Sequence, residues 1–187
     1  MTAQRMTARR DGAGPGIAIR SERGCDAEAI RAVTEAAFEG AVHADGSEPG
    51  IPAALRADGA LAISLVAERA EKSGAGEGEI VGHVAFSPVE LGGEGGWLGV
   101  GPLSVRPDLQ RSGIGGSLMR EGLERARAGG ARGCVLIGDP GYYRRFGFAA
   151  REGLRYGTVP DAYVMALPFG AGEPTGTIRF HPAFGEH

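Results

Sequence analysis

The residues best suited to chemistry lie in a glycine-rich loop, residues 110–116, between a strand-like and a helix-like apolar segment. The first N–H groups of a helix have no partner within the helix, and the helix dipole places partial positive charge there. Gly113, Gly115 and Gly116 lack side chains, so the backbone can approach a ligand closely, and Arg111 adds a positive charge. The loop therefore predicts a cradle for a diphosphate, with a tight strand-to-helix turn as the simpler alternative.

Two common nucleotide-binding loops fit this segment poorly. The loop that binds nucleoside triphosphates requires a lysine followed by Ser or Thr, and residues 110–116 contain no lysine. The dinucleotide fingerprint Gly-x-Gly-x-x-Gly needs a third glycine where Leu118 stands, and it follows the first strand of a parallel unit. A nucleotide-binding protein of another class therefore stays as an alternative with little support.

The segments around the loop predict an α/β sandwich with a mixed sheet. Apolar residues recur at helical spacing over residues 26–38, where Asp26 is the expected cap, and over residues 113–128. Apolar segments separated by glycine-rich links predict an antiparallel meander of three strands in the middle of the chain. Strands are expected at residues 17–20, 61–67, 80–91, 97–105, 133–137, 163–167 and 177–180, and short helices at 52–56 and after Asp139.

Composition and charge narrow the class of protein. Of 187 residues 34 are glycine, yet 42% are hydrophobic, so one core can form and the glycines belong to turns. Residues 1–16 have no periodic apolar face, which predicts a disordered tail before a single domain over residues 17–187. A net charge of −3 without a basic stripe argues against nucleic acid as a partner. We see no apolar run of about 18 residues and no secretory signal, and therefore expect no membrane contact and a cytoplasmic protein.

Two motifs carry a resemblance to a known family. Residues 110–115, QRSGIG, match the Q/R-x-x-G-x-G/A motif of the GCN5-related N-acetyltransferases (GNAT), and residues 143–148, YRRFGF, match their Y-x-x-x-G-F element. The chain resembles most the bacterial YhbS-like branch of predicted acetyltransferases. That likeness extends over about residues 17–184 and is carried by VGHVAFSPV (81–89), LGVGPLSVRP (98–107), GDPGYYRRFGF (138–148) and GTIRFHPAF (176–184).

The resemblance implies a GNAT-like acyl-CoA N-acyltransferase fold, with a mixed, mostly antiparallel central sheet flanked by helices. It implies acetyl-CoA as the acetyl donor, its pyrophosphate held by backbone amides of the loop and its pantetheine arm by those of the preceding strand. Plain strand core is the alternative role for the side chains of that strand, and both roles can hold. The implied cofactor-binding residues are Leu103, Ser104, Val105, Gln110, Arg111, Ser112, Gly113, Ile114, Gly115 and Gly116.

Tyr143 matches the family's usual general acid. A phenol with a pKa of about 10 can protonate the leaving CoA thiolate. Tyr142 is the alternative acid, and a core aromatic residue is the alternative role for either. Asp139 precedes Pro140, and we expect it to cap the helical turn that positions Tyr143.

The general base stays open at the level of sequence. His83 titrates near neutrality and shares a strand face with Ser87, but a structural histidine is the simpler interpretation. Glu48 and Glu94 lie in loops and are equally well explained as solvated. By the same resemblance, residues 43–52 border the acceptor pocket.

The sequence is therefore identified as an acetyl-CoA-dependent N-acetyltransferase. The acetyl group would pass directly to a small-molecule or peptide amine in a ternary complex, and a homodimer is a family-level expectation. Cys25 and Cys134 stand too far apart in the sequence for a metal cluster and in no setting typical of a nucleophile, so we expect no metal. The alternative is a non-catalytic acyl-CoA-binding or regulatory module of the same fold.

Overall fold

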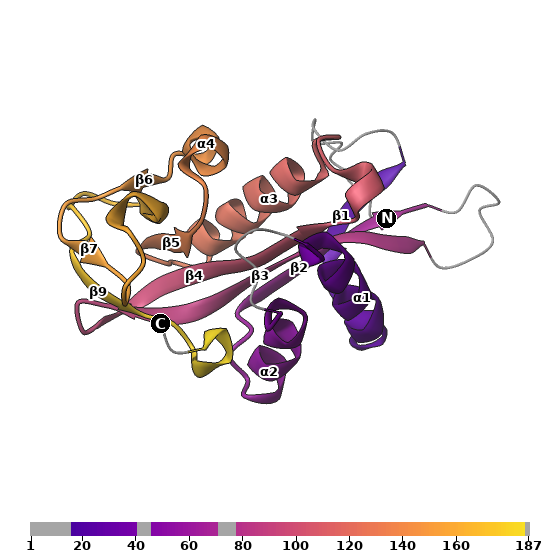
Figure 1. Ribbon diagram of the computed structural model, residues 1–187, viewed down its shortest axis with the longest axis horizontal. Helices are drawn as coiled ribbons and strands as arrows, with labels where there is room; N and C mark the ends of the chain where they lie inside the picture. Colours follow the sequence, from indigo (N-terminus) through magenta and orange to yellow (C-terminus); the bar gives the residue numbers. More distant parts are fainter. Residues whose placement is uncertain (1–15, 41–45, 71–77, 186–187) are drawn as a thin grey trace, which may run out of the picture.

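The computed structural model describes residues 16–40, 46–70 and 78–185 (Figure 1). The predicted N-terminal tail lies almost wholly outside these ranges, as do parts of the loops 43–52 and 73–79. In the described residues, nine strands form one sheet with β1-β2-β3-β4-β5-β8-β6 as the main path, and β9 pairs with β3 and β7. The strands are β1 (Ile17–Ser21), β2 (Ile63–Arg69), β3 (Glu79–Leu91), β4 (Glu94–Val105), β5 (Gly133–Ile137), β6 (Ala149–Ala150), β7 (Leu154–Arg155), β8 (Val164–Pro168) and β9 (Gly176–Arg179).

Antiparallel pairing dominates the sheet, as the sequence predicts. Strands β2, β3 and β4 form the expected meander, and the parallel pairs are β4 with β5 and β7 with β9. Four α-helices accompany the described strands: α1 (Ala27–Phe38), α2 (Ile51–Ala57), α3 (Ile114–Ala128) and α4 (Pro140–Tyr143). The mixed, mostly antiparallel sheet flanked by helices is therefore confirmed.

Strands β4 and β5 separate part of the way along β4. They pair only through Trp97, Leu98 and Gly99 of β4, whereas β4 continues to Val105. Between Val100 and Leu103, β4 also carries an extra residue relative to β3, which marks a β-bulge. The edge of β4 beyond Gly99 is therefore not covered by β5, and α3 begins shortly after that edge ends.

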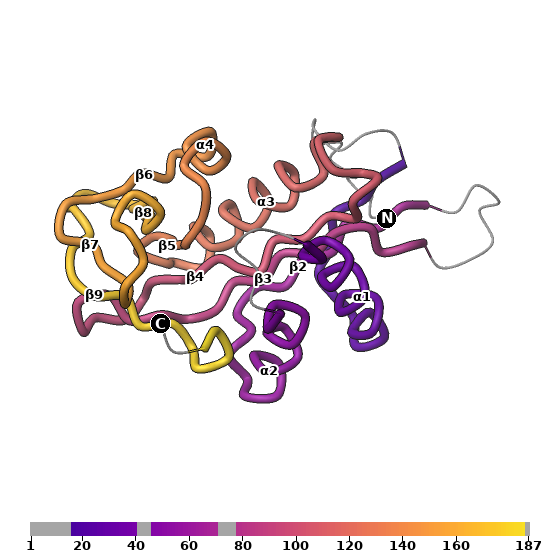
Figure 2. The backbone as a smooth tube through the Cα atoms, in the orientation of Figure 1, coloured from indigo at the N-terminus to yellow at the C-terminus, as the bar shows by residue number. Residues whose placement is uncertain are grey.

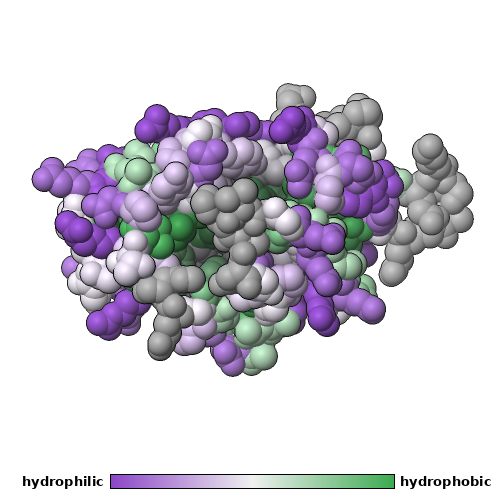
Figure 3. Space-filling model, in the orientation of Figure 1, coloured by the Kyte–Doolittle hydropathy of each residue, from purple (hydrophilic) through white to green (hydrophobic). Residues whose placement is uncertain are grey.

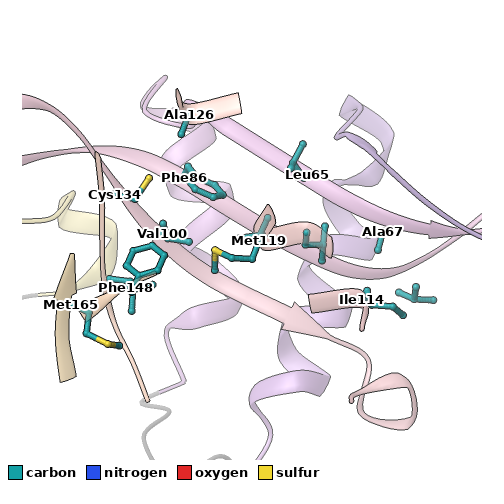
Figure 4. Packing of buried hydrophobic residues seen from close by; sticks show 14 residues of the cluster. Leu65, Ala67, Phe86, Val100, Ile114, Met119, Ala126, Cys134, Phe148 and Met165 are labelled. Atoms are coloured by element: carbon teal, nitrogen blue, oxygen red, sulfur yellow. The ribbon is translucent and has the colours of Figure 1, made fainter. Parts of the chain in front are cut away.

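Helix α3 covers one face of the sheet, and α1 and α2 lie on the opposite face (Figure 1). On the α3 face, Leu118 and Met119 pack with strand residues such as Phe86 into the main core cluster, whose labelled members point toward one another in Figure 4. A Cβ atom built on Gly122 would lie 2.3 Å from the Phe86 ring, so this close helix–sheet contact depends on a glycine.

The C-terminal segment returns to the face that carries α2. After β9 the chain runs beside α2, as the yellow end of the tube in Figure 2 shows. Ala183 and Phe184 pack against a small core cluster formed by Ile51, Leu55 and Ala85. This segment thus encloses the central strands on the side opposite α3.

Two local features differ from the expectations. Asp26 precedes α1, but its side chain makes no cap hydrogen bond to that helix. It accepts hydrogen bonds from the Arg20 guanidinium at 2.6 and 3.0 Å, since β1 passes beside it, and from the backbone N–H of Arg23 at 2.6 Å. The two-residue strands β6 and β7 were not expected, because a two-residue segment carries no periodicity.

Candidate functional site

The loop before α3 has the conformation that its glycines and arginine require. Gly113 has φ 93° and Arg111 has φ 61°, the one positive φ of a residue other than glycine in the described part of the chain. The Ser112 hydroxyl donates to the carbonyl of Leu109 at 2.5 Å, and the Gln110 side chain donates to the carbonyl of Val105 at 3.2 Å. These side-chain bonds fix the loop against the end of β4.

Among the described residues, no side chain caps the first turn of α3, so its backbone donors can bind a ligand. Gly113, the residue before the helix, supplies no side-chain cap, and it is exposed. Helix α3 has 15 residues, so the partial positive charge of a full helix dipole falls on this turn. Free N–H groups and this charge together make an anion-binding cradle.

Arginine side chains surround this turn. The Arg120 guanidinium lies 3.3 Å from the position that a Cβ on Gly116 would take. Arg145 stacks over the ring of Tyr142, with its guanidinium carbon 4.5 Å from the ring centroid. With exposed Arg111 they give the mouth of the cradle the positive charge that a polyanionic ligand requires.

The strand residues singled out by the sequence lie next to this cradle. A Cβ on Gly115 would lie 3.5 Å from a methyl group of Val105 and 4.0 Å from one of Leu103. Both strand side chains are partly buried and pack on the main core. Ser104 faces the opposite side of the sheet and is buried, with its hydroxyl 3.0 Å from that of Thr34. The tertiary structure thus places Leu103 and Val105 beside the start of α3, with the Ser104 side chain on the other face of the sheet.

Helix α4 adds two phenols to the same region. Asp139 accepts a hydrogen bond from the backbone N–H of Gly141 at 2.8 Å, which confirms the predicted cap. The Tyr142 hydroxyl lies 2.9 Å from a Cβ built on Gly115, so Tyr142 leans across the start of α3. Tyr143 turns toward β5 instead, with its ring against Gly138 and its edge on Phe148, at a centroid distance of 6.2 Å.

Both phenols stay protonated at neutral pH. Desolvation among the neighbouring rings raises the pKa of Tyr143 strongly, and the nearby Tyr142 and Asp139 raise it further. Burial also raises the pKa of Tyr142, although Arg145 and Arg120 oppose this shift. Each tyrosine therefore carries a proton at neutral pH, and the geometry leaves Tyr142 as the alternative to Tyr143.

On the opposite face of the sheet, His83 is fully buried and pairs in register with Ser104 of β4. Its Nε2 atom lies 2.8 Å from the Ser64 hydroxyl, and Ser64 in turn donates to Glu22. Burial, with a smaller effect of Arg56, lowers the pKa of His83 to about 4 although Glu22 opposes the shift. The sequence pointed to His83 but gave no signal for Ser64, which lies in β2, or for Glu22, which follows β1.

Several other features lie outside this site. Burial raises the pKa of Cys134 to about 12, whereas Cys25 is exposed. No group of three or more metal-ligating side chains occurs among the described residues. In that same part of the chain, every helix is too short or too polar to cross a membrane. A depression of about 700 Å³, bordered by Trp97 and Phe169, lies at the far end of α3. Glu94 borders it, but none of the predicted catalytic or cofactor-binding residues does.

The surface near the site is polar at its rim. Figure 3 shows hydrophilic side chains over much of the outline of the molecule and hydrophobic ones in smaller patches farther in on the same face.

Comparisons with known proteins agree with the fold. Residues 61–150 match the model of the acetyltransferase (GNAT) domain. The chain is 36% identical over 173 residues to the uncharacterized N-acetyltransferase YhbS of Escherichia coli K12, covering 89% of this chain and 97% of YhbS.

Two crystal structures show the same architecture. A GNAT family acetyltransferase from Brucella melitensis, in complex with acetyl-CoA, has a TM-score of 0.77 and 49% identity over 90% of this chain and 97% of its own. Escherichia coli YhbS in complex with CoA has a TM-score of 0.79 and 31% identity over 91% of this chain and 92% of its own. This degree of identity agrees with the loop conformation and the separated strands. The chain belongs to the GNAT family of N-acetyltransferases, and within it resembles YhbS.

Proposed function

We propose that this protein transfers the acetyl group of acetyl-CoA directly to an amine. The observation that carries the proposal is the uncapped first turn of α3, placed beside the edge of β4 that β5 leaves uncovered. The relatives from Brucella melitensis and Escherichia coli, crystallised with acetyl-CoA and CoA, support the same donor here. The amides of residues 113–116 would hold the pyrophosphate, with Gln110, Arg111 and Ser112 shaping the loop.

The pantetheine arm would lie along β4. Because β5 pairs with β4 only as far as Gly99, residues 103–105 have no strand partner on that side. Their backbone can hydrogen-bond an extended ligand as a further strand would. A backbone N–H near Leu103 would stabilise the oxyanion of the tetrahedral intermediate, a contribution of about 2.7–4 kcal/mol in comparable enzymes.

Tyr143 would protonate the leaving thiolate. The phenol is protonated at neutral pH because burial raises its pKa, and α4 holds it beside the separated strands. Direct transfer in a ternary complex is favoured over a covalent enzyme intermediate, because Cys134 is buried with a pKa of about 12. The acceptor is an amine of a small molecule or a peptide, and the cytoplasmic location and the homodimer stay predictions.

The first experiment compares the melting temperature with acetyl-CoA, CoA, ATP and NAD added separately. A ligand at about 100 times its dissociation constant adds about 2.7 kcal/mol of stability, so acetyl-CoA and CoA should raise the melting temperature and ATP and NAD should not. A shift with ATP or NAD alone would refute the proposed donor.

The second experiment separates the enzyme from the non-catalytic module. Thiol release from acetyl-CoA is followed with a panel of primary amines for the wild type, Tyr143→Phe and the matched control Tyr142→Phe. We expect Tyr143→Phe to lose about 10²-fold or more in turnover with an unchanged acetyl-CoA shift. A loss in Tyr142→Phe instead would reassign the acid, and no release by the wild type with any amine would favour the binding module.

A further inference from the structure

A chain of polar side chains crosses three elements on the sheet face opposite α3. Glu22 follows β1, Ser64 lies in β2 and His83 in β3. The Ser64 hydroxyl donates to a Glu22 carboxylate oxygen and lies 2.8 Å from His83 Nε2. Arg56 donates to both oxygens of the same carboxylate, at 2.8 and 3.0 Å. The chain therefore runs from a partly exposed carboxylate to a fully buried imidazole.

The direction of each hydrogen bond follows from the groups themselves. Burial alone would raise the pKa of Glu22, but the hydrogen bonds from Arg56 and Ser64 hold it below its ordinary value, so the carboxylate only accepts. The Ser64 hydroxyl donates its single proton to Glu22, and its oxygen must then accept from His83. A neutral imidazole has one N–H group, which this arrangement places on Nε2. Nδ1 of His83 therefore carries a bare lone pair.

That lone pair has no partner in the described part of the chain. Nδ1 of His83 is buried and accepts no hydrogen bond from any described residue, and the same holds for the hydroxyl of Ser87, four residues along β3. Buried polar atoms without a partner are rare and carry a free-energy cost, so their presence calls for an explanation. A donor that arrives with the substrate would satisfy Nδ1.

His83 is one strand away from the predicted donor site. Its Cα pairs in register with that of Ser104, inside the stretch of β4 that would hold the pantetheine arm. The acyl-CoA cradle lies at the start of α3, so the α3 layer is occupied when the donor binds. The acceptor would then reach the thioester carbon from the α1–α2 layer, which is the face that His83 and Ser104 share.

We propose that Glu22, Ser64 and His83 form the proton relay that deprotonates the attacking amine, with Nδ1 of His83 as its inner end. This inference rests on the proposed acetyl transfer. His83 is the catalytic residue, because Nδ1 meets the amine directly or through one water molecule. Ser64 and Glu22 are positioning residues that act through it.

The step balances in atoms and charge. The amine nitrogen forms a bond to the thioester carbon, and the carbon–sulfur bond breaks when the tetrahedral intermediate collapses. One N–H proton passes to Nδ1 as the Nε2 proton moves to Ser64 and the Ser64 proton moves to Glu22, so a full imidazolium need not accumulate. The thiolate takes the Tyr143 proton. Glu22 then releases its proton to solvent, and Tyr143 regains one.

The test compares three relay variants with a matched control. Ser64→Ala, Glu22→Gln and His83→Gln each interrupt the relay, whereas Ser87→Ala removes a buried hydroxyl from the same sheet face outside it. The acceptor is the amine that gives the wild type its fastest thiol release in the panel. We expect each relay variant to lose about 10²-fold in kcat at pH 7, the usual scale of general-base catalysis, with an unchanged acetyl-CoA shift. Ser87→Ala should retain wild-type turnover, and Ser64→Thr should restore most of it.

The pH profile distinguishes a relay from a purely structural role. The charged groups that face His83 are Glu22 and Arg56. Without the relay, hydroxide must remove the proton, so the deficit of Ser64→Ala should shrink between pH 7 and pH 9. A deficit that is the same at every pH would overturn the relay, and so would relay variants with the turnover of Ser87→Ala. In either case, acetyl-CoA binding and acetyl transfer by the wild type would still support the proposed function. A wild type that did not bind acetyl-CoA, or that transferred no acetyl group, would overturn both the relay and the proposed function.

A measurement on the unmodified protein covers the case in which a variant fails to fold. Nitrogen-15 NMR of the histidine rings reports which nitrogen carries the proton. We expect His83 to show a protonated Nε2 and a bare Nδ1 at pH 7. A proton on Nδ1 would overturn the relay.

Discussion

Mild acid is expected to destabilise the protein through His83. An unfolded histidine takes up a proton below pH 6.5, whereas buried His83 has a pKa of about 4 and stays neutral. Between these values the unfolded state binds more protons than the folded state, so stability falls as the pH falls. At pH 5, which is 1.5 units below the ordinary value, the loss from this one side chain is about 2 kcal/mol, since each pKa unit corresponds to about 1.4 kcal/mol. Below pH 4 the loss should level off at about 3 kcal/mol.

The assay is urea unfolding of the wild type and His83→Gln at pH 7 and pH 5. Other groups also destabilise the protein in acid, because ion pairs hold the pKa values of Asp26 and Glu68 below their ordinary range. Their contribution is common to both proteins, and the packing change caused by the substitution is common to both pH values. The difference between the two pH-dependent losses therefore isolates His83, and we expect it to be about 2 kcal/mol. Equal losses in the two proteins would refute the reasoning that His83 is neutral because it is buried.

Three further substitutions test the packing around the site. Gly122→Ala places a Cβ 2.3 Å from the Phe86 ring, so we expect a loss of about 1–3 kcal/mol in urea unfolding, and an unchanged midpoint would contradict the close contact. Asp139→Ala removes the cap of α4 and should cost about 1 kcal/mol, measured as a lower melting temperature; equal melting temperatures would show that the cap contributes nothing. Gly115→Ala places a Cβ 2.9 Å from the Tyr142 hydroxyl, so calorimetry should show several-fold weaker acetyl-CoA binding, and an equal dissociation constant would argue against the cradle.

Most of the fold could be predicted from local patterns. Helices α1 and α3 and the meander β2–β4 follow from periodicity and glycine-rich links, and the cap at Asp139 follows from the proline after it. These signals are local, because a helix or strand face and a cap depend on residues within a few positions of one another. Asp26 shows the limit of this argument. Its residue type suits a helix cap, but its carboxylate accepts hydrogen bonds from Arg20 of a neighbouring strand.

The sequence by itself predicted an anion cradle in this loop, since glycines and an arginine before an amphipathic helix favour anion binding. It also predicted that Tyr143 belongs to a helical turn capped by Asp139. Only the tertiary structure decided where β4 and β5 separate, that Tyr142 leans over α3 while Tyr143 faces β5, and that Glu22 and Ser64 reach His83. Each of these depends on strand pairing and packing between segments far apart in the chain, and a single sequence carries no local signal for such contacts.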